Sequence, residues 1–434
     1  MLPETYPVKK FNKKTPIEVS VPGSKSITNR ALLIAALADG KSTLKGVLFS
    51  DDSRHFLQAL IDLGFEVSVN ETNCEVEIAG CGGRIPCVSN TAEDFHKIYV
   101  GSAGTAARFL TAYLGLSEGK FVVDSSEQMK KRPMKELLVA LEELGTSVSY
   151  MEEEYHFPFA IGCEAWKKNE VTIDVDKSSQ FLSALLIVSV LSKKDFTIHV
   201  LGSHGMAYVD MTVRMMAQFG VAVTRTDAQT FVIGAGQQYR AMDYQIEPDL
   251  SAACYFYAMS PVLGVPAKVR AVHKDCMQGD IQFLHVLSDM GCTVEEEEDG
   301  VKVFPPKGKM LGGTWDLSSF SDQALTLAAI APFAEGEVTI QNVGHIRLQE
   351  CDRIQAILQN LRALGITCSE ENGTITIEPG EPHGTLIETF EDHRVAMAFS
   401  IPGLAIGDVV IKNPLCCRKT FENYFEVLDD LYRL

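Results

Sequence analysis

The architecture of this chain is clearest in residues 101–148, which read GSAGTAARFLTAYLGLSEGKFVVDSSEQMKKRPMKELLVALEELGTSV. An apolar stretch rich in small residues predicts a helix, and EGKFVVD after it predicts a turn and a short strand. A second, amphipathic helix then ends at Gly145, where Thr146 begins another strand. The segment therefore predicts a small α/β unit with one apolar and one amphipathic helix.

The same plan occurs six times along the chain. The apolar helices begin near residues 23, 101, 178, 251, 321 and 391, so neighbouring copies are 70–78 residues apart. In the first five copies the second helix ends at a glycine, namely Gly64, Gly145, Gly220, Gly291 and Gly365. A glycine at the same place in five copies argues against a run of unrelated α/β elements. Because solenoid repeats are only about 20–50 residues long, each copy is predicted to be a subdomain.

The six copies predict two pseudo-threefold domains with three copies in each. Because the apolar helices carry few charges, we expect the helices inside each domain and the sheets outside. The division falls in the polar segment 234–250, and two short crossings near residues 21–23 and 246–249 leave a hinge. The predicted domains are residues 23–246, and residues 1–22 together with 247–434.

Composition predicts a globular cytoplasmic protein. Of the 434 residues 46% are apolar and 22% are charged, and the net charge of −18 argues against nucleic-acid and membrane partners. The first residues are polar, and the charge-free runs 181–191 and 395–407 are too short to span a membrane. The 11 cysteines are irregularly spaced, which predicts reduced thiols rather than a zinc site or a disulfide framework.

Cations and hydroxyls stand at the predicted helix starts of the first half. The set comprises Lys25, Ser26, Arg30, Arg108 and Arg132, together with Ser178, Ser179 and Gln180. A solvated helix start or a basic surface turn would explain each motif by itself. Together they suit an anion, because helix N-termini present free N–H groups and a partial positive charge.

Acidic and basic side chains occur together at the helix starts of the second half. Glu350 and Arg353 are three residues apart on one helix face, where a surface ion pair is the alternative explanation. Asp322 stands at another helix start, where it would serve simply as an N-cap. Arg394 and Lys419 add two more cations. With the cations of the first half, these residues predict a site for two small polyanionic ligands.

Seven segments of the chain resemble, in the same order, the signature segments of the EPSP synthases, a family of enolpyruvyl transferases. They are VPGSKSITNR, GSAGTAAR, KKRPM, SSQFLSALL, LQECDR, EDHRVAMAF and RKTFENYF. The segment PGSKS distinguishes this family from the related enolpyruvyl transferases that act on UDP-N-acetylglucosamine. The resemblance implies a two-domain inside-out α/β barrel built from six βαβαββ-type repeats, three per domain.

The resemblance also implies a reaction. The carboxyvinyl group of phosphoenolpyruvate would pass to the 5-hydroxyl of shikimate 3-phosphate through a tetrahedral intermediate, with release of phosphate. This is a step of the shikimate pathway, which leads through chorismate to the aromatic amino acids. It implies no metal and no organic cofactor, small molecules as the only partners, and a monomer.

Residue roles follow from the matched segments. The implied phosphoenolpyruvate ligands are Lys25, Gly104, Arg132, Gln180, Arg353, Arg394 and Lys419. The implied shikimate 3-phosphate ligands are Lys25, Ser26, Arg30, Ser178, Ser179, Gln180, Tyr208, Asp322, His345 and Gln349. Asp322 would take the proton of the attacking hydroxyl, and Glu350, assisted by Lys25, would protonate the methylene carbon. Such a reaction needs one ionised carboxylate and one proton donor.

Four positions depart from the family pattern. Ser102, Gly205, His345 and Gln349 stand where the family usually has Asn, Ser, Asn and Lys. The missing lysine at Gln349 leaves three interpretations, which are a different acceptor, compensation by Arg347, or reduced activity. Two other functions stay open: transfer to another phosphorylated or nucleotide-linked alcohol, and ligand binding without turnover. Gly104 matches the loop of glyphosate-sensitive members, so we expect sensitivity to glyphosate.

Overall fold

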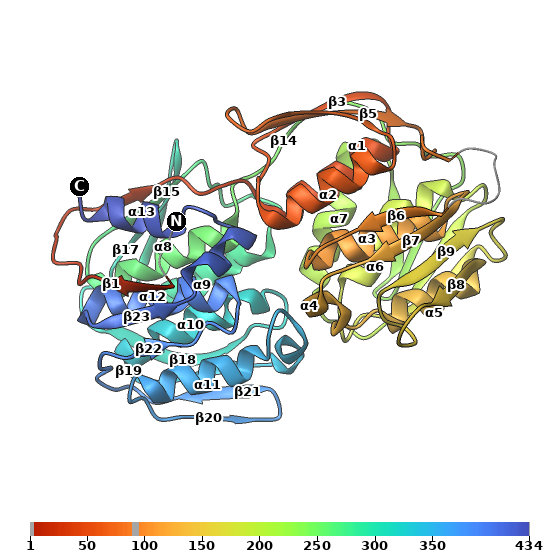
Figure 1. Cartoon of the computed structure of the whole chain (residues 1–434). Coiled ribbons are helices and arrows are strands. Elements are labelled where there is room, and N and C mark those ends of the chain that lie inside the picture. The colour runs from red at the N-terminus through yellow and green to blue at the C-terminus, as the bar shows by residue number, and fades with distance from the viewer. Residues whose placement is uncertain (1–3, 89–94, 434) are drawn as a thin grey trace. The chain divides into compact units, whose positions relative to one another are not determined.

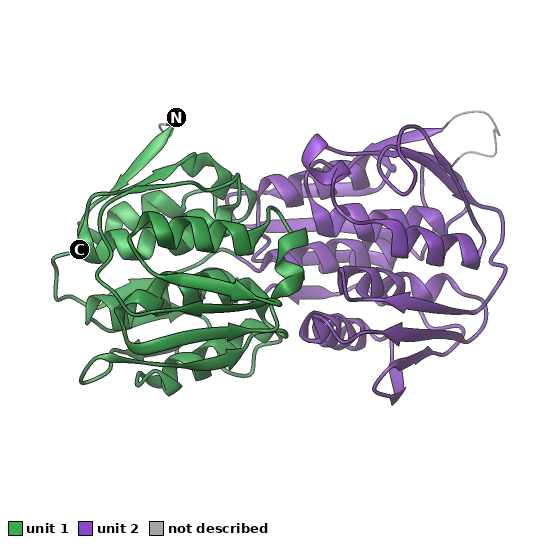
Figure 2. Cartoon of the chain, turned by 90° about the horizontal axis from the view of Figure 1, so that it is seen from below, with its two compact units in different colours: residues 1–22, 247–434 green, residues 23–246 purple. Residues whose placement is uncertain are grey.

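The computed structural model describes residues 4–88 and 95–433 (Figure 1). The chain divides into two compact units, which Figure 2 colours separately. Unit 1 comprises residues 1–22 and 247–434, and unit 2 comprises residues 23–246. Both units mix helices with strands, so the fold is of the α/β class, as predicted. Over the described ranges, none of the helices has both the length and the apolar character that crossing a membrane requires.

Among its described residues, unit 2 has three four-stranded sheets of one design. In spatial order their strands are β14 (Asp243–Gln245), β3 (Asp39–Lys45), β5 (Glu75–Cys81) and β4 (Glu66–Asn70); β6 (His96–Tyr99), β7 (Lys120–Asp124), β9 (Phe159–Cys163) and β8 (Thr146–Tyr150); and β10 (Glu170–Asp174), β11 (Phe196–Leu201), β13 (Thr230–Ile233) and β12 (Val223–Asp227). The first two strands of each sheet are parallel, and the other neighbours are antiparallel.

The helices of unit 2 fall into two kinds. They are α1 (Lys25–Leu37), α2 (Asp51–Asp62), α3 (Gly104–Gly115), α4 (Glu127–Lys130), α5 (Lys135–Leu144), α6 (Gln180–Val188) and α7 (Met206–Gln218). Every residue of α3 is buried, and α3 packs against α1 and α6. By contrast α5 buries one face only, through Leu137, Leu141, Leu144 and their neighbours. The predicted pair of an apolar and an amphipathic helix is therefore confirmed for residues 101–148.

In the described part of unit 1, two sheets repeat this design and a third sheet has three strands. Its sheets, in spatial order, are β16 (Thr293–Glu297), β17 (Gly300–Phe304), β15 (Ala267–Arg270) and β2 (Ile17–Val19); β18 (Met310–Asp316), β19 (Ala334–Gln341), β21 (Thr374–Ile377) and β20 (Cys368–Glu371); and β1 (Thr5–Val8), β23 (Val409–Lys412) and β22 (Leu386–Ile387). Its α-helices are α8 (Leu250–Leu263), α9 (Phe283–Asp289), α10 (Ala324–Ile330), α11 (Arg353–Ala363), α12 (His393–Ile406) and α13 (Tyr424–Leu431). The buried helix α12 packs against α8 and α10.

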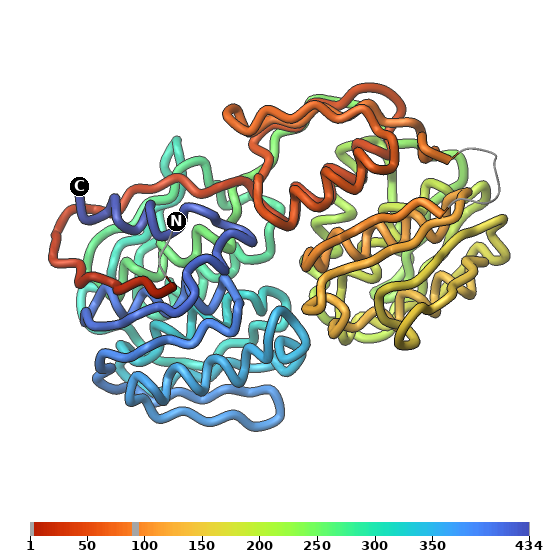
Figure 3. Tube along the Cα trace, in the orientation of Figure 1, coloured from red at the N-terminus to blue at the C-terminus, as the bar shows by residue number. Residues whose placement is uncertain are grey.

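The N-terminal segment belongs to unit 1. Strand β1 pairs antiparallel with β23, near the other end of the chain, and β2 pairs parallel with β15. Figure 3 shows the pairing of β1 with β23 as a red trace beside a blue one. The last strand of unit 2, β14, pairs parallel with β3 in the same way. Each unit therefore joins strands from the two ends of its own sequence.

The glycines that end the amphipathic helices adopt the left-handed conformation. Their φ values lie between 84° and 121° at Gly64, Gly145, Gly220, Gly291 and Gly365. Other residues rarely adopt this conformation, so glycine is the favoured residue where the chain leaves a helix for a strand. The predicted end of each of these helices is confirmed.

Candidate active site

Helix α1 presents Lys25 at its first turn. The side chain of Ser24 caps the helix by accepting a hydrogen bond from Ile27 N at 3.4 Å. Lys25 Nζ lies 3.7 Å from Asp52 Oδ2, and Asp52 is buried in the first turn of α2. This carboxylate holds the ammonium group in place. Asp52 could not be predicted as a site residue, because nothing near it in the sequence links it to Lys25.

Arg30 is buried one turn further along α1. Its Nε donates to Thr212 Oγ1 at 2.7 Å, and its terminal nitrogens donate to the carbonyls of Ser26 and Tyr208 at 2.9 and 3.1 Å. Burial lowers the pKa of Arg30 to about 10, so the guanidinium stays charged at neutral pH. Arg30 thus orders two predicted shikimate 3-phosphate ligands, and its own role as a ligand stays a prediction.

Arg108 connects three predicted phosphoenolpyruvate-binding segments. The guanidinium donates to Gln180 Oε1 at 2.7 Å, to the carbonyl of Pro133 at 3.1 Å and to the carbonyl of Gly104 at 3.4 Å. Its side chain is 1% exposed and lies over the ring of Phe181 at 5.4 Å. A single buried cation therefore fixes the start of α3, the turn after Arg132 and the start of α6.

Gly104 and Arg132 touch. A Cβ atom on Gly104 would lie 2.4 Å from Arg132 Nη1 and 2.8 Å from Cζ. Any larger residue at position 104 must therefore displace the guanidinium. Arg132 itself is 8% exposed, so it has little room to move.

The two departures from the family pattern that lie in unit 2, Gly205 and Ser102, have local explanations. Gly205 has a φ of 64°, and a Cβ there would lie 2.6 Å from Ser179 Oγ, so glycine permits this close approach. Ser102 Oγ lies 2.6 Å from Ser126 Oγ, which joins the loop before α3 to the N-cap of α4. Ser178 accepts from Gln180 N at 3.3 Å. The predicted ligands of unit 2 thus lie at connected helix starts.

Arg353 is the centre of the cluster in unit 1. It begins α11, is 1% exposed, and contacts four acceptors. Its nitrogens donate to Asp392 at 2.7 Å, to Asp322 at 2.9 Å and to Glu350 at 3.2 Å, and also to Gln349. Burial opposes the charge, but the carboxylates of Asp392, Glu350 and Asp322 together raise the pKa of Arg353 above its usual value. The two predicted catalytic carboxylates are therefore hydrogen-bonded to one guanidinium.

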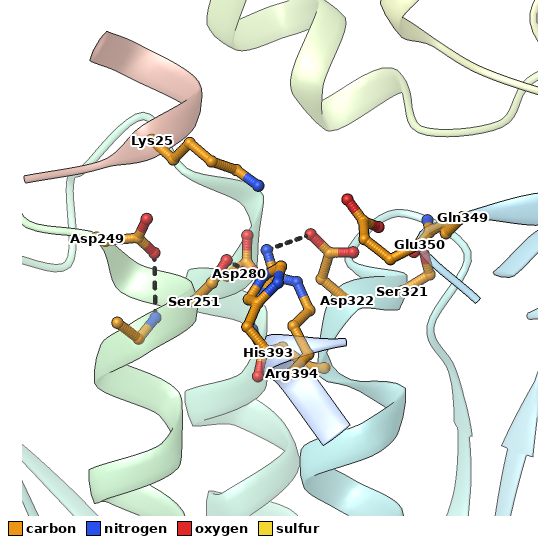
Figure 4. Close-up of polar contacts among 12 residues, drawn as sticks. Lys25, Asp249, Ser251, Asp280, Ser321, Asp322, Gln349, Glu350, His393 and Arg394 are labelled. Carbon is orange, nitrogen blue, oxygen red and sulfur yellow. Dashed lines mark hydrogen bonds and ion pairs between the residues drawn. The ribbon is translucent and has the colours of Figure 1, made fainter. Parts of the chain in front are cut away.

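Arg394 and Lys419 complete this cluster. Arg394 Nη2 lies 2.7 Å from Asp322 Oδ2, an ion pair drawn in Figure 4. Lys419 Nζ lies 3.5 Å from Glu350 Oε1, and it ends the short helix η6 (Pro414–Lys419). The side chains of Asp322 and Glu350 are 18% and 10% exposed, so each keeps limited access to solvent.

Asp392 is a further site residue that the sequence analysis gave no role. It is fully buried, contacts Arg353 through both carboxylate oxygens, and accepts from Arg394 N at 2.9 Å. It therefore orients the Arg353 guanidinium and caps the first turn of α12, which carries Arg394. Asp392 lies two positions before Arg394 in the segment EDHR, but nothing in the sequence linked it to Arg353.

The contacts of Arg347 do not support the interpretation that it compensates for the missing lysine at position 349. This residue pairs with Asp352 at 2.9 Å and with Glu370 at 2.6 Å. Gln349 instead accepts a hydrogen bond from Arg353, and His345 Nε2 lies 2.8 Å from Ser321 Oγ. His345 therefore adjoins the residue before Asp322, and Gln349 adjoins the central guanidinium.

Comparisons with known proteins decide the family. The family model described as EPSP synthase (3-phosphoshikimate 1-carboxyvinyltransferase) matches residues 11–428. The chain belongs to this family. A 3-phosphoshikimate 1-carboxyvinyltransferase from Nostoc punctiforme is 40% identical over 97% of this chain and 98% of that protein. One from Photobacterium profundum is 42% identical over 95% of this chain and 96% of that protein. The resemblance inferred from the seven segments is confirmed.

Solved structures of relatives share the fold. An EPSP synthase from Acinetobacter baumannii matches with a TM-score of 0.82 and 24% identity over 98% of both chains. The enolpyruvyl transferase NikO from Streptomyces tendae matches with a TM-score of 0.75 and 16% identity, over 98% of this chain and 96% of that one. Family membership thus rests on sequence, and the structural matches support the α/β architecture.

Proposed function

We propose that this chain transfers the carboxyvinyl group of phosphoenolpyruvate to the 5-hydroxyl of shikimate 3-phosphate and releases phosphate. The observation that carries the proposal is the shared contact of Asp322 and Glu350 with Arg353, flanked by Arg394 and Lys419. Three fixed cations suit the carboxylate and phosphate of one substrate. Two carboxylates beside them suit the proton transfers that the reaction needs.

Addition comes first in the proposed mechanism. Asp322 accepts the proton of the 5-hydroxyl while the oxygen bonds to C2 of phosphoenolpyruvate, and Glu350 delivers a proton to C3. Elimination then breaks the bond between C2 and the phosphate oxygen, a proton returns from C3 to Glu350 to restore the double bond, and the proton held by Asp322 passes to the departing phosphate. Arg353, Arg394 and Lys419 stabilise the anionic groups throughout, since preorganised charges act most strongly where water is limited.

The predicted ligands that lie in unit 2 keep their assigned roles in this proposal. Lys25 and Arg132 bind phosphoenolpyruvate, and Ser178, Ser179 and Gln180 bind the phosphorylated acceptor. Support comes from the hydrogen bonds through which Arg108 and Arg30 fix these helix starts. A protein whose only task is binding would not need two carboxylates on one guanidinium, which favours turnover over sensing.

The acceptor is tested by comparing two alcohols. Phosphate release from phosphoenolpyruvate is measured with shikimate 3-phosphate and, separately, with UDP-N-acetylglucosamine. We expect release with the first acceptor only. The converse result would make Gln349, the residue without the family's lysine, the reason for a different acceptor. Release with neither, while phosphoenolpyruvate still binds by calorimetry, would favour ligand binding without turnover.

Replacement of Gly104 by alanine is expected to raise KM for phosphoenolpyruvate about tenfold and to change kcat less. The new methyl group displaces the Arg132 guanidinium, and a lost ion contact of this kind is worth roughly 1–2 kcal/mol.

The same replacement of Gly104 by alanine should raise the inhibition constant of glyphosate. Gly308→Ala is the matched control, because nothing lies within 4 Å of its Cβ position and its φ is not positive. Equal inhibition constants for wild type and Gly104→Ala would reject both the contact and the expected glyphosate sensitivity.

We further propose that each compact unit is one domain, in which three βαβαββ-type repeats surround their buried helices as an inside-out barrel. Support comes from the common strand order of the five four-stranded sheets in the described ranges and from the burial of α3 and α12. We propose that the protein is a cytoplasmic monomer. Size-exclusion chromatography with light scattering tests the oligomeric state, and a mass near 47.6 kDa is expected.

A further inference from the structure

Asp280 is a buried carboxylate next to the cluster in unit 1 that the proposed mechanism does not use. It lies in the short helix η2 (Gly279–Gln282) and is 2% exposed. Ser251 Oγ donates to its Oδ1 at 3.0 Å, and Gln323 Nε2 donates to the same oxygen at 2.6 Å. Figure 4 shows Asp280 beside Ser251 and Arg394. A buried carboxylate is costly unless it has partners, so its presence calls for an explanation.

The hydrogen bond to Gln323 reaches the turn that carries Asp322. Gln323 is fully buried in η3 (Ser321–Gln323), directly after Asp322. Its amide orientation is fixed, because its Oε1 accepts from Thr326 Oγ1 at 2.9 Å and its Nε2 therefore faces Asp280. Asp280 thus anchors the backbone on one side of Asp322, while Arg353 and Arg394 hold its carboxylate on the other.

Asp280 also interacts with Asp322 through charge. Burial raises the pKa of Asp280 to about 6, and the negative charge of Asp322 raises it as well, whereas Arg394 lowers it. The other titratable groups that face Asp280 are Asp249, Cys254 and Cys276. Electrostatic interaction is mutual, so the charge of Asp280 also acts on Asp322.

We propose that Asp280 is a positioning residue for Asp322: it anchors the η3 turn through Gln323 and places a second negative charge behind the reacting carboxylate. This inference rests on the proposed function of Asp322 as the base. A neighbouring negative charge makes Asp322 a stronger proton acceptor, and Asp280 supplies it without contacting substrate. Its charge, rather than its shape, is the functional feature.

The first test is the pH profile of kcat in Asp280→Asn. Asparagine keeps the size and the accepting oxygen but removes the charge. We expect the acidic limb of the profile to move down by about one pH unit, with less than a threefold change in KM for phosphoenolpyruvate. Asp280→Glu keeps the charge and should leave the limb near its wild-type position. Ser251→Ala removes a hydrogen bond to the same oxygen, keeps the charge, and should also leave the limb unchanged.

The second test does not need activity. Carbon-13 labelling of aspartate carboxyl groups allows the titration of Asp280 to be followed by NMR in wild type and in Asp322→Asn. We expect the midpoint of Asp280 to fall when Asp322 loses its charge. Unchanged midpoints would overturn the coupling, and coincident acidic limbs in wild type and a folded Asp280→Asn would overturn the positioning role. Loss of turnover in wild type with the NMR coupling intact would reject only the proposed reaction.

Discussion

Replacement of Asp322 by asparagine is expected to lower kcat by about 10²–10⁴-fold, the range that a general base contributes. Asparagine retains one oxygen for Arg353 or Arg394 but takes up no proton from the attacking hydroxyl. KM for phosphoenolpyruvate should change far less, because the cations that bind its anionic groups remain. Steady-state kinetics with both substrates varied separates the two effects.

Asp352→Asn is the control for that experiment. Asp352 is the N-cap of α11, where it accepts from Gln355 N and pairs with the exposed Arg347. Asparagine caps helices as well as aspartate does, so kcat should stay within about twofold of wild type. A kcat for Asp322→Asn within tenfold of wild type would contradict the assignment of Asp322 as the base.

Replacement of Arg353 by methionine is expected to lower the free energy of unfolding by about 3–5 kcal/mol, the cost of breaking a buried ion pair. Asp392 would be left fully buried without its guanidinium, and Asp322 and Glu350 would lose a shared partner. Phosphoenolpyruvate binding should also be lost. Urea unfolding measures the first effect, and isothermal calorimetry on the folded variant measures the second.

Arg347→Met is the matched control, with the same substitution six positions earlier. Arg347 also pairs with two carboxylates, but its side chain is 37% exposed, and solvent-exposed pairs contribute about 0–1 kcal/mol. If both substitutions lowered the free energy of unfolding equally, burial would not be the reason why the Arg353 cluster stabilises the protein.

Local sequence patterns predicted much of the fold and the identity of the helix-start residues. A glycine that ends a helix acts within a few residues, so the ends of the five amphipathic helices could be predicted from their sequence alone. The chemistry of Glu350 and Arg353 was equally visible, because the two residues are three positions apart on one chain segment.

Partners distant in the sequence could not be predicted in this way. Asp392 meets Arg353 across 39 residues, Asp280 meets Gln323 across 43, and Arg30 meets Thr212 across 182. A single sequence holds no signal for such pairings, because each residue of a pair, taken alone, looks like an ordinary polar or charged residue. The pairing of Arg347 with Glu370, across 23 residues, could not be predicted from the sequence either.

The central claim is tested most directly by following all reacting molecules at once. Phosphoenolpyruvate and shikimate 3-phosphate are mixed with the protein, and phosphorus-31 NMR records both substrates and products over time. The account predicts equimolar loss of the two substrates, equimolar appearance of inorganic phosphate, and a product that retains the 3-phosphate and carries an enolpyruvyl ether. Phosphate released without loss of shikimate 3-phosphate, or no change in either substrate, would contradict it.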